Sequence, residues 1–300
     1  MRKKTGIRTY RLITLFMATM LIVAAPLLNS VFQIDFIQGW YQSISIGNLW
    51  FVSPLEGIES IITSKVLSTS LLIGMSIPIL IALFMGRIFC SWVCPISFIS
   101  EMIDTLFKVV TRKKYRKTGI RLPKRTLWAV LTTELLLTMM AGVPIFVFLS
   151  PPGLVGREIM MLTFFRTVAF EGVIILAVIL LHIISKRFFC RHLCPLGALL
   201  GILGAKRRLY INLDSSLCIN CGICRLACPL DLKPEKNETI TAYCWNCGEC
   251  VDACSNSALT YRWNDITVRP ALPDNIPDTI PEKRAKSSEQ RPGPTSIKPT

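Results

Sequence analysis

The sequence predicts an all-α membrane unit of four transmembrane helices, followed by a small α+β domain and a disordered tail. Two observations lead to this prediction. Long apolar segments occupy most of the first two thirds of the chain, and the mean hydropathy of +0.48 is high for a soluble protein. The twelve cysteines all fall in four short motifs, two of them directly after apolar segments and two within the small domain.

Four apolar segments are long enough to cross a bilayer as helices, which takes about 20 residues. Pro78 and Pro144 lie inside two of them, where proline can kink a membrane helix without ending the span. The first segment is about twice as long as the apolar core of a signal peptide, so we expect a span there and not a cleaved leader. The four predicted spans cover residues 12–32, 66–89, 127–149 and 168–185.

Lysines and arginines alternate between dense and sparse stretches around these spans. Five precede the first span and one lies between the first and second spans. Residues 87–125 then hold ten, the stretch between the third and fourth spans holds two, and residues 186–208 hold six. Positive residues stay on the cytoplasmic side of a membrane. We therefore expect a multi-pass protein of the bacterial inner (cytoplasmic) membrane with both termini in the cytoplasm. The net charge of +15 then reflects membrane topology, and no nucleic-acid partner is expected.

The chain divides into four predicted parts. The last of them is rich in Pro, Ser, Lys and Glu and lacks apolar periodicity, which is typical of disorder. The parts are a basic cytoplasmic N-terminus at residues 1–11, the membrane unit at 12–211, the small domain at 212–263 and the tail at 264–300.

Eight cysteines form two C-x2-C-x2-C-x3-C runs in the small domain. The runs closely fit the motif of bacterial ferredoxins with two 4Fe–4S clusters, in which the fourth cysteine of each run binds the other cluster. Zinc also binds C-x2-C pairs, but two complete runs so close together favour iron–sulfur clusters in a ferredoxin-like domain. We expect the first cluster on Cys218, Cys221, Cys224 and Cys254, and the second on Cys244, Cys247, Cys250 and Cys228.

The other four cysteines form an internal repeat. Cys90 and Cys94 follow the second span, and Cys190 and Cys194 follow the fourth, each pair as C-x3-C-P after basic and aromatic residues. Cysteines four apart share one face of a helix, so the four thiols are predicted to converge at the cytoplasmic surface of the membrane. They are candidate redox thiols, or ligands of an additional metal or cluster site, with inert interfacial cysteines as the alternative. A stable disulfide is not expected in the reducing cytoplasm.

The chain resembles the NapH family, the ferredoxin-type quinol dehydrogenase components of periplasmic nitrate reductase systems. The resemblance covers the chain from the first span to Trp263. It rests on the twin C-x3-C-P motifs, on the two four-cysteine runs, and on the stretches FCSWVCP, FCRHLCPLGALLG and SPPGLVGR. Membrane ferredoxins of nitrous-oxide reductase, methylamine dehydrogenase and cytochrome-oxidase assembly systems share the cysteine architecture. NapH fits better because it is short, with four spans and both runs near its C-terminus.

The resemblance implies a membrane electron-transfer subunit. Such a subunit oxidises menaquinol or ubiquinol and passes electrons through 4Fe–4S clusters towards a periplasmic nitrate reductase. Its implied partners are a periplasmic ferredoxin-type NapG-like subunit or a tetrahaem cytochrome. The alternatives are a membrane iron–sulfur accessory factor for assembly or maintenance of a metalloenzyme, and an anchor whose clusters are structural.

Two ionisable residues inside the predicted spans are candidates for the quinol site. Glu134 lies in the third span and His182 in the fourth, at similar depths from the cytoplasmic side. Ionisable groups are costly in hydrocarbon and are functional candidates there. Quinol oxidation releases two protons, so its site needs a proton acceptor. A helix-packing role for either residue is the alternative.

Overall fold

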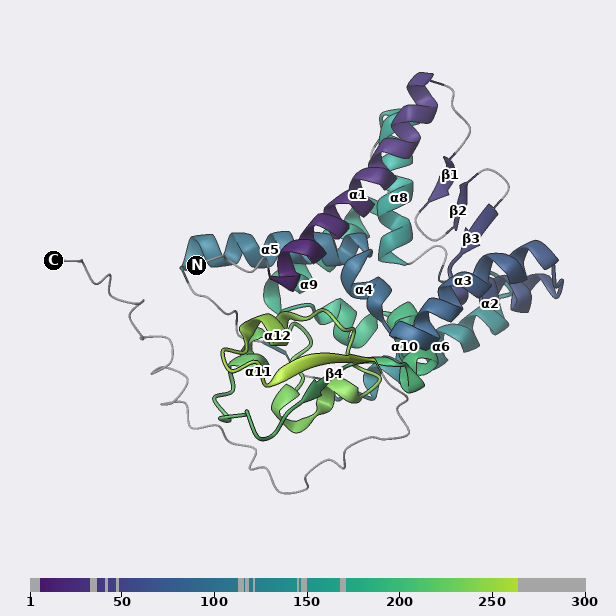
Figure 1. Ribbon diagram of the computed structural model, residues 1–300. Coiled ribbons are helices and arrows are strands. Elements are labelled where there is room, and N and C mark those ends of the chain that lie inside the picture. Colours follow the sequence, from purple (N-terminus) through teal and green to yellow (C-terminus); the bar gives the residue numbers. More distant parts are fainter. Residues whose placement is uncertain are drawn as a thin grey trace.

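The computed structural model describes residues 6–263 except 33–36, 41–42, 47–48, 113–115, 117–118, 121, 145, 147–149 and 168–170. The expected tail at residues 264–300 therefore lies outside the described residues, as do the first five. Most of the described chain is helical, and the regular β-structure is confined to a three-stranded and a two-stranded sheet (Figure 1).

The helical part runs from residue 7 to residue 206. Its long helix α1 is followed by a small sheet and by helices that are mostly shorter than the predicted spans. The elements are α1 (Ile7–Phe32), α2 (Pro54–Ser64), α3 (Thr69–Met85), α4 (Ile88–Trp92), α5 (Pro95–Thr111), α6 (Thr126–Ala141), α8 (Pro151–Met160), the π-helical turn η1 (Met161–Phe165), α9 (Glu171–Ile184), the π-helical turn η2 (Phe189–Leu193), α10 (Pro195–Leu203) and the 3-10 turn η3 (Gly204–Lys206).

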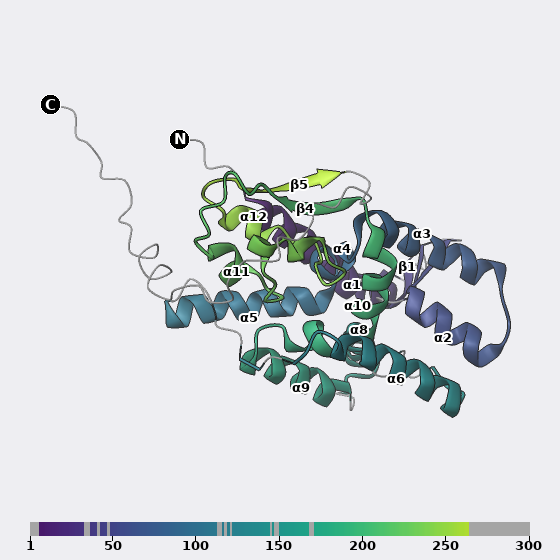
Figure 2. The ribbon, with the colours of Figure 1, turned by 90° about the horizontal axis from the view of Figure 1, so that it is seen from below.

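The helices that correspond to the four predicted spans do not form one parallel bundle. Three groups of helices extend in different directions from a common centre near α4 and α10 (Figures 1 and 2). The first group is α1 and α8, the second is α2, α3 and α6, and the third is α5 and α9. Of the described helices, α1 alone is long and apolar enough to cross a bilayer, over Ile7–Ala24. The helices α3, α6 and α9 are apolar but shorter, with 17, 16 and 14 residues.

A three-stranded antiparallel sheet covers one side of α3. Its strands are β1 (Ile37–Trp40), β2 (Ser43–Ile46) and β3 (Leu49–Val52), in that order. A Cβ atom at Gly74 would lie 2.2 Å from the carbonyl oxygen of Trp50. Glycine is therefore required at this point of α3, because the backbone of β3 packs directly on it.

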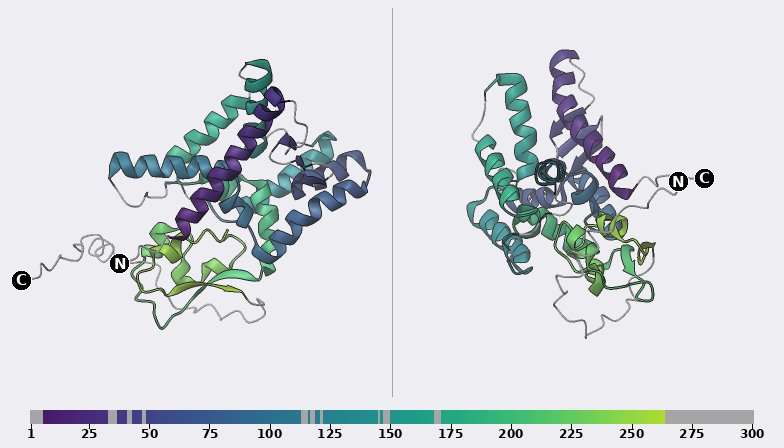
Figure 3. Two further views of the ribbon diagram at one scale, coloured as in Figure 1. Left: turned by 45° about the horizontal axis from the view of Figure 1, so that its top comes forward. Right: turned by 90° about the vertical axis from the view of Figure 1, so that its left-hand side faces the viewer.

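The cysteine-rich domain is closed by two paired strands. The strands β4 (Leu209–Leu213) and β5 (Leu259–Trp263) are antiparallel, with Ile211 opposite Tyr261. The pairing begins three residues before the expected start at residue 212. Between the strands lie α11 (Ile223–Ala227), the 3-10 turns η4 (Pro234–Lys236) and η5 (Glu238–Ile240), and α12 (Glu249–Ala253). Figure 3 shows this domain lying against the base of α1.

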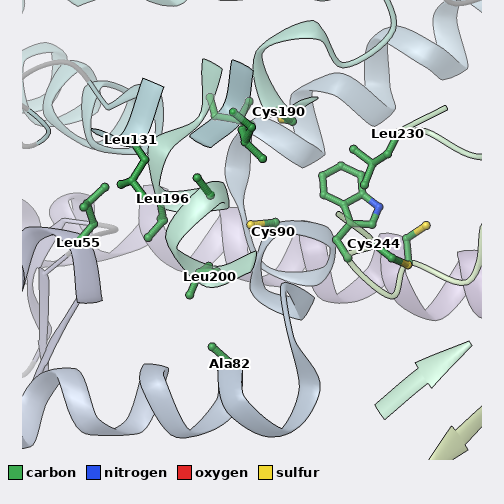
Figure 4. Packing of buried hydrophobic residues seen from close by; sticks show 14 of the residues in the cluster. Leu55, Ala82, Cys90, Leu131, Cys190, Leu196, Leu200, Leu230 and Cys244 are labelled. Carbon is green, nitrogen blue, oxygen red and sulfur yellow. The ribbon is translucent and has the colours of Figure 1, made fainter. Parts of the chain in front are cut away.

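The main hydrophobic core extends from the helical part into the cysteine-rich domain. Leu55, Leu131 and Leu196 from three helices belong to it, together with Leu230 and Trp245 from the domain. Figure 4 shows cysteines from both parts within this packing, with Cys90 and Cys190 near its centre and Cys244 to one side. The two parts of the chain are thus packed together without an intervening linker.

Candidate functional site

The cysteines of the first expected cluster surround one cavity. Cys218, Cys221 and Cys224 come from the first run, and Cys254, the last cysteine of the second run, reaches the same cavity from the end of α12. Glu235 also lines it. A cysteine of the second run thus lines the same cavity as three cysteines of the first run.

The cysteines of the second expected cluster surround another cavity. Cys244, Cys247 and Cys250 line it, and Cys228 joins them from the first run. Trp245 is almost fully buried beside them, at 1% exposure. Cys244, Trp245 and Cys247 of this second cavity belong to the main core that is shared with the helices.

The same short turn, Cys-x-Asn-Cys-Gly, begins both runs. Asn220 and Asn246 have φ angles of 51° and 54°, and Gly222 and Gly248 have φ angles of 72° and 79°. Asparagine and glycine tolerate this left-handed backbone better than other residues. Each glycine then caps a short helix, α11 or α12. The turn curls the chain so that successive cysteines face one cavity.

A single metal ion and a polynuclear cluster need different arrangements of their ligands. No three His, Cys, Asp or Glu side chains among them lie close enough to bind one metal ion. Thiolates around a single zinc ion would lie about 4 Å apart, because the Zn–S distance is about 2.3 Å. A polynuclear iron–sulfur cluster fills the centre of its ligand set, so four cysteines around one cavity are the arrangement that it needs.

The two C-x3-C-P motifs fold alike, but not as the spacing predicted. Cys90 lies in α4 and Cys190 in η2, whereas Cys94 and Cys194 are N-cap residues of the helices that follow. The second cysteine of each pair has extended backbone, because a following proline disfavours the helical conformation. The paired cysteines therefore lie on either side of a break between two helices, and not on one face of a continuous helix.

The four thiols of these motifs nevertheless lie in one region. Cys90 and Cys190 are buried in the main core, and Cys94 and Cys194 pack against it. Burial raises the pKa of the Cys94 thiol, and thiolates at Cys90 and Cys190 would raise it further. Burial also raises the pKa of the Cys194 thiol, and thiolates at Cys90 and Cys190 would raise it further. Burial therefore favours the protonated form of these thiols, and a bound metal or cluster would replace the protons.

Arg187 lies between the C-x3-C-P thiols and the second cavity. The thiols of Cys190 and Cys247 both lie within electrostatic reach of its guanidinium. The guanidinium stacks over the ring of Trp245, 5.1 Å from the ring centre, and Nη1 donates to Ser97 Oγ at 3.3 Å. One buried cation thus contacts the helical part and the cysteine-rich domain together.

A buried network of charges surrounds this position. Arg187 Nη2 donates to Glu101 Oε2 at 2.5 Å, and Arg11 Nη2 donates to the same oxygen at 3.1 Å. Arg11 also pairs at 2.5 Å with Glu249, which opens α12. Burial alone would raise the pKa of Glu101, but Arg187, Arg11 and Arg8 outweigh it and hold the pKa at about 2. No periodicity or motif in the sequence indicates this network, which joins α1, α5 and α12.

The two residues expected at a quinol site have different neighbours. His182 is buried in the last turn of α9, with Nε2 3.9 Å from Cys190 Sγ. Glu134 lies in α6, within electrostatic reach of Glu59 on α2. His182 therefore adjoins the C-x3-C-P thiols, whereas Glu134 belongs to a group of carboxyls that sequence reasoning did not single out. Glu59 lies between the first two predicted spans, and no pattern in the sequence indicates that it is buried.

Two family models match the chain. The 4Fe-4S binding domain family matches residues 67–116 and 168–212, which include both C-x3-C-P motifs. The 4Fe-4S dicluster domain family matches residues 210–267, which include both four-cysteine runs. All twelve cysteines therefore lie within segments that match 4Fe–4S binding families.

Two relatives match most of the chain. The ferredoxin-type protein NapH of Escherichia coli is 27% identical over 279 residues, which are 88% of this chain and 94% of NapH. NapH of Haemophilus influenzae is 27% identical over 80% of this chain and 85% of its own length. The chain is a homologue of the NapH ferredoxin-type proteins. The resemblance that the sequence motifs indicated is thus confirmed, and the chain is a ferredoxin-type 4Fe–4S electron-transfer protein.

Other relatives of this NapH homologue match it over a smaller share of their own length. The methylamine utilization ferredoxin-type protein MauN of Methylobacillus flagellatus is 31% identical over 62% of this chain and 64% of its own length. YccM of Escherichia coli is 29% identical over 75% of this chain and 63% of its own length. The chain thus spans less than two thirds of these two relatives. No solved structure matches the chain.

Proposed function

We propose that this NapH homologue is a membrane electron-transfer subunit that oxidises quinol and delivers electrons towards a periplasmic nitrate reductase. The observation that carries the proposal is the position of Arg187, within reach of both Cys190 and Cys247. A thiol set in the apolar helical part and a thiol set in the soluble domain then share one buried boundary. Electron transfer requires such closeness, whereas a domain that merely anchors or stores a cluster does not.

Eight cysteines are proposed as cluster ligands in two sets. A 4Fe–4S cluster bound by four thiolates accepts and releases one electron at a time. Within the chain, the residues around each set hold the thiols in place and keep water from the second set, where Trp245 is buried. The sets are Cys218, Cys221, Cys224 and Cys254, then Cys228, Cys244, Cys247 and Cys250. Cys90, Cys94, Cys190 and Cys194 are proposed as a further redox or cluster site.

The membrane arrangement and partners are part of the same proposal. We infer a multi-pass inner-membrane protein with cytoplasmic termini, because positive residues alternate around the apolar segments. Menaquinol or ubiquinol would supply the electrons. A NapG-like ferredoxin-type subunit or a tetrahaem cytochrome would accept them on the periplasmic side, as the homology to NapH suggests.

Metal analysis and quinol reduction test the proposal. The protein, purified in detergent, should contain at least about eight iron and eight sulfide per chain, and its absorption near about 400 nm should be bleached by a quinol. Cys247→Ser should lose about four iron, whereas the control Ser216→Ala, at an exposed serine of the same domain, should lose none.

Two outcomes would contradict it in different ways. Zinc without iron would overturn the iron–sulfur assignment. Clusters that dithionite reduces but no quinol reduces would remove the quinol dehydrogenase role and favour the alternative, an accessory factor for a metalloenzyme.

A further inference from the structure

Charged side chains of opposite sign lie beside the two cysteine cavities. Glu235 lines the first cavity, and its Oε2 lies 3.6 Å from the Sγ of Cys224. Arg187 and Arg11 lie beside the second cavity, where both guanidinium groups are within electrostatic reach of the Cys247 thiol. The reduction potential of a 4Fe–4S cluster depends on the charges, hydrogen bonds and solvent around its sulfurs. The two cysteine sets therefore offer a cluster different electrostatic surroundings.

Glu235 brings a buried carboxyl group without a cation to the first cavity. It is 7% exposed. Among the described residues, the ion pairs of this domain involve Glu238, Glu249 and Asp231, and none involves Glu235. Burial, and then Glu235, raise the pKa of the Cys224 thiol. This side chain thus disfavours negative charge on the sulfur. Because reduction adds one negative charge to a cluster, a carboxylate at this place opposes it.

Two arginines bring positive charge to the second cavity. The guanidinium carbon of Arg187 lies 5.1 Å from the ring centre of Trp245, a residue that lines this cavity. Arg11 is 1% exposed and pairs at 2.5 Å with Glu249, which directly precedes Cys250 of the cavity. Arginine does not lose its proton inside proteins. Both positive charges are therefore permanent.

The carboxylates that pair with these arginines do not cancel them. Burial raises the pKa of the Cys247 thiol, Arg11 acts against burial, and Glu249 adds to burial less than Arg11 opposes it. Asp104 lies 3.9 Å from Arg187 and also forms an ion pair with a further arginine. The net effect of these pairs at Cys247 is to favour negative charge.

Burial acts against the cations, and Glu101 shows which effect is larger. The cysteines of the second run that line the second cavity are almost fully buried, and burial disfavours additional charge. Glu101 is also buried, at 4% exposure, yet Arg187, Arg11 and Arg8 outweigh its burial and hold its pKa at about 2. Two of the same arginines reach Cys247, so they can favour the more negative state of a cluster there.

We propose that the second cluster has the higher reduction potential of the two, because Arg187 and Arg11 favour its reduced form while Glu235 disfavours the reduced form of the first. The inference rests on the proposed binding of two 4Fe–4S clusters and deepens the electron-transfer function by giving the order of their potentials. One electron that enters the domain reduces the second cluster and stays there. Its transfer to the first cluster oxidises the second and reduces the first, and this step is uphill until an acceptor removes the electron.

A redox titration followed by electron paramagnetic resonance tests this order. Full-length protein, purified in detergent with its clusters, is reduced stepwise with titanium(III) citrate and mediators. The cysteine-rich domain should show two separate one-electron waves. The wave at higher potential should be missing in Cys247→Ser and the wave at lower potential in Cys221→Ser, which assigns them to the second and the first cluster. Waves that persist in both variants belong to another site.

Glu235→Gln tests the carboxylate at the first cavity. It should increase the equilibrium constant for reduction in the lower wave about tenfold, which is about 59 mV for one electron, and leave the upper wave in place. The matched control is Glu238→Gln, at a carboxylate of the same segment that pairs with Lys124 at 2.8 Å, and it should move neither wave. A lower wave that stays in place in Glu235→Gln would overturn the role of this residue.

Arg187→Gln tests the cation at the second cavity. It should decrease the equilibrium constant for reduction in the upper wave about tenfold. Arg187→Lys should restore most of this potential, because it keeps the charge although it loses the planar stack. The control Arg262→Gln, at an exposed arginine on β5, should leave both waves in place. If Arg187→Gln does not retain its iron, the order of the waves and the shift in Glu235→Gln decide.

The outcomes separate this inference from the proposed function. Coincident waves, or loss of the upper wave in Cys221→Ser, would overturn the order of potentials. Mediators take the place of quinol in the titration, so a protein that shows the expected order but that no quinol reduces would overturn the quinol dehydrogenase role alone. A protein that quinol reduces but whose two waves coincide would overturn this inference alone.

Discussion

The guanidinium carbon of Arg187 lies 5.1 Å from the centre of the Trp245 ring. Arg187 precedes the second C-x3-C-P motif, and Trp245 lies inside the second four-cysteine run. The contact is supported close by, where Ser91 Oγ donates to the Trp245 carbonyl oxygen at 2.7 Å. The chain segments that carry the two kinds of cysteine motif therefore hold each other directly, and substitutions at this boundary should affect both.

Arg187→Gln should weaken the attachment of the cysteine-rich domain. The change removes the stack on Trp245 and the 2.5 Å contact with Glu101, leaving a buried carboxylate with fewer cations. We expect the free energy of unfolding to fall by about 3 kcal/mol, measured by denaturant titration of the cluster absorbance. The free energy of unfolding of Arg187→Lys should lie between those of wild type and Arg187→Gln, because lysine keeps the charge but not the planar stack.

The control for Arg187 is Arg262→Gln, at an exposed arginine on β5. It should change the stability by less than about 0.5 kcal/mol. Similar losses in the two glutamine variants would mean that the stability depends on general charge and not on the stacked cation.

Glu56 should make the stability of the fold depend on pH. Burial, followed by the charge of Glu59, raises its pKa to about 7 in the folded chain, against 4.5 when unfolded. Between these values the folded chain binds more protons than the unfolded chain, so stability falls as the pH rises. The stability gain of Glu56→Gln over wild type should grow by about 1 kcal/mol between about pH 6 and pH 8.

Thermal unfolding of the two proteins in the same detergent, at both pH values, measures this difference. A gain that stays constant with pH would show that Glu56 titrates near its ordinary pKa. A gain that shrinks as the pH rises would show that the carboxylate form is stabilised by the fold.

Reporter fusions should reveal the side of the membrane on which each part lies. A reporter fused after Trp263 should work only as a cytoplasmic marker, and one inserted near Gly153 only as a periplasmic marker. Alkaline phosphatase and a fluorescent protein distinguish the two sides. The reverse pattern would move every cysteine motif to the periplasm and contradict the distribution of positive charge.

The four C-x3-C-P thiols should behave as one unit. Single serine substitutions of Cys90, Cys94, Cys190 or Cys194 should each reduce quinol-dependent electron transfer strongly, while the spectrum of the cysteine-rich domain remains. A site that needs all its ligands fails when any is missing, so Cys94→Ser/Cys194→Ser should be little worse than either single variant. Mild and additive effects, measured as rates of terminal acceptor reduction, would indicate separate packing residues.

The grouping of the first three cysteines of each run could be predicted from sequence, because a short-range turn brings them together. The repeated Cys-x-Asn-Cys-Gly pattern needs only left-handed backbone at Asn220 and Gly222, or at Asn246 and Gly248. The C-x3-C-P motifs were harder, because the same spacing fits a continuous helix. Proline after Cys94 and Cys194 decides against it through a local steric effect, so the sequence itself carries the signal for the break.

The expected spans show a similar limit. The apolar segments predicted helices at the observed places, since α3, α6 and α9 all lie within or beside them. Their ends and directions were not predictable from hydropathy. Gly86 and Gly142, both with positive φ, end α3 and α6 short of the predicted boundaries, and the packing of α2 and α10 against these helices sets their directions.

The sequence by itself determined the cysteine sets, the apolar segments and the membership of a ferredoxin-type family. These properties depend on residues close together in the chain, where spacing and hydropathy are sufficient. Only the tertiary structure decided that Arg187 stacks on Trp245 and that Glu101 is buried among arginines. Burial and electrostatic neighbours depend on which distant segments pack together, and a single sequence does not encode that packing in any local pattern.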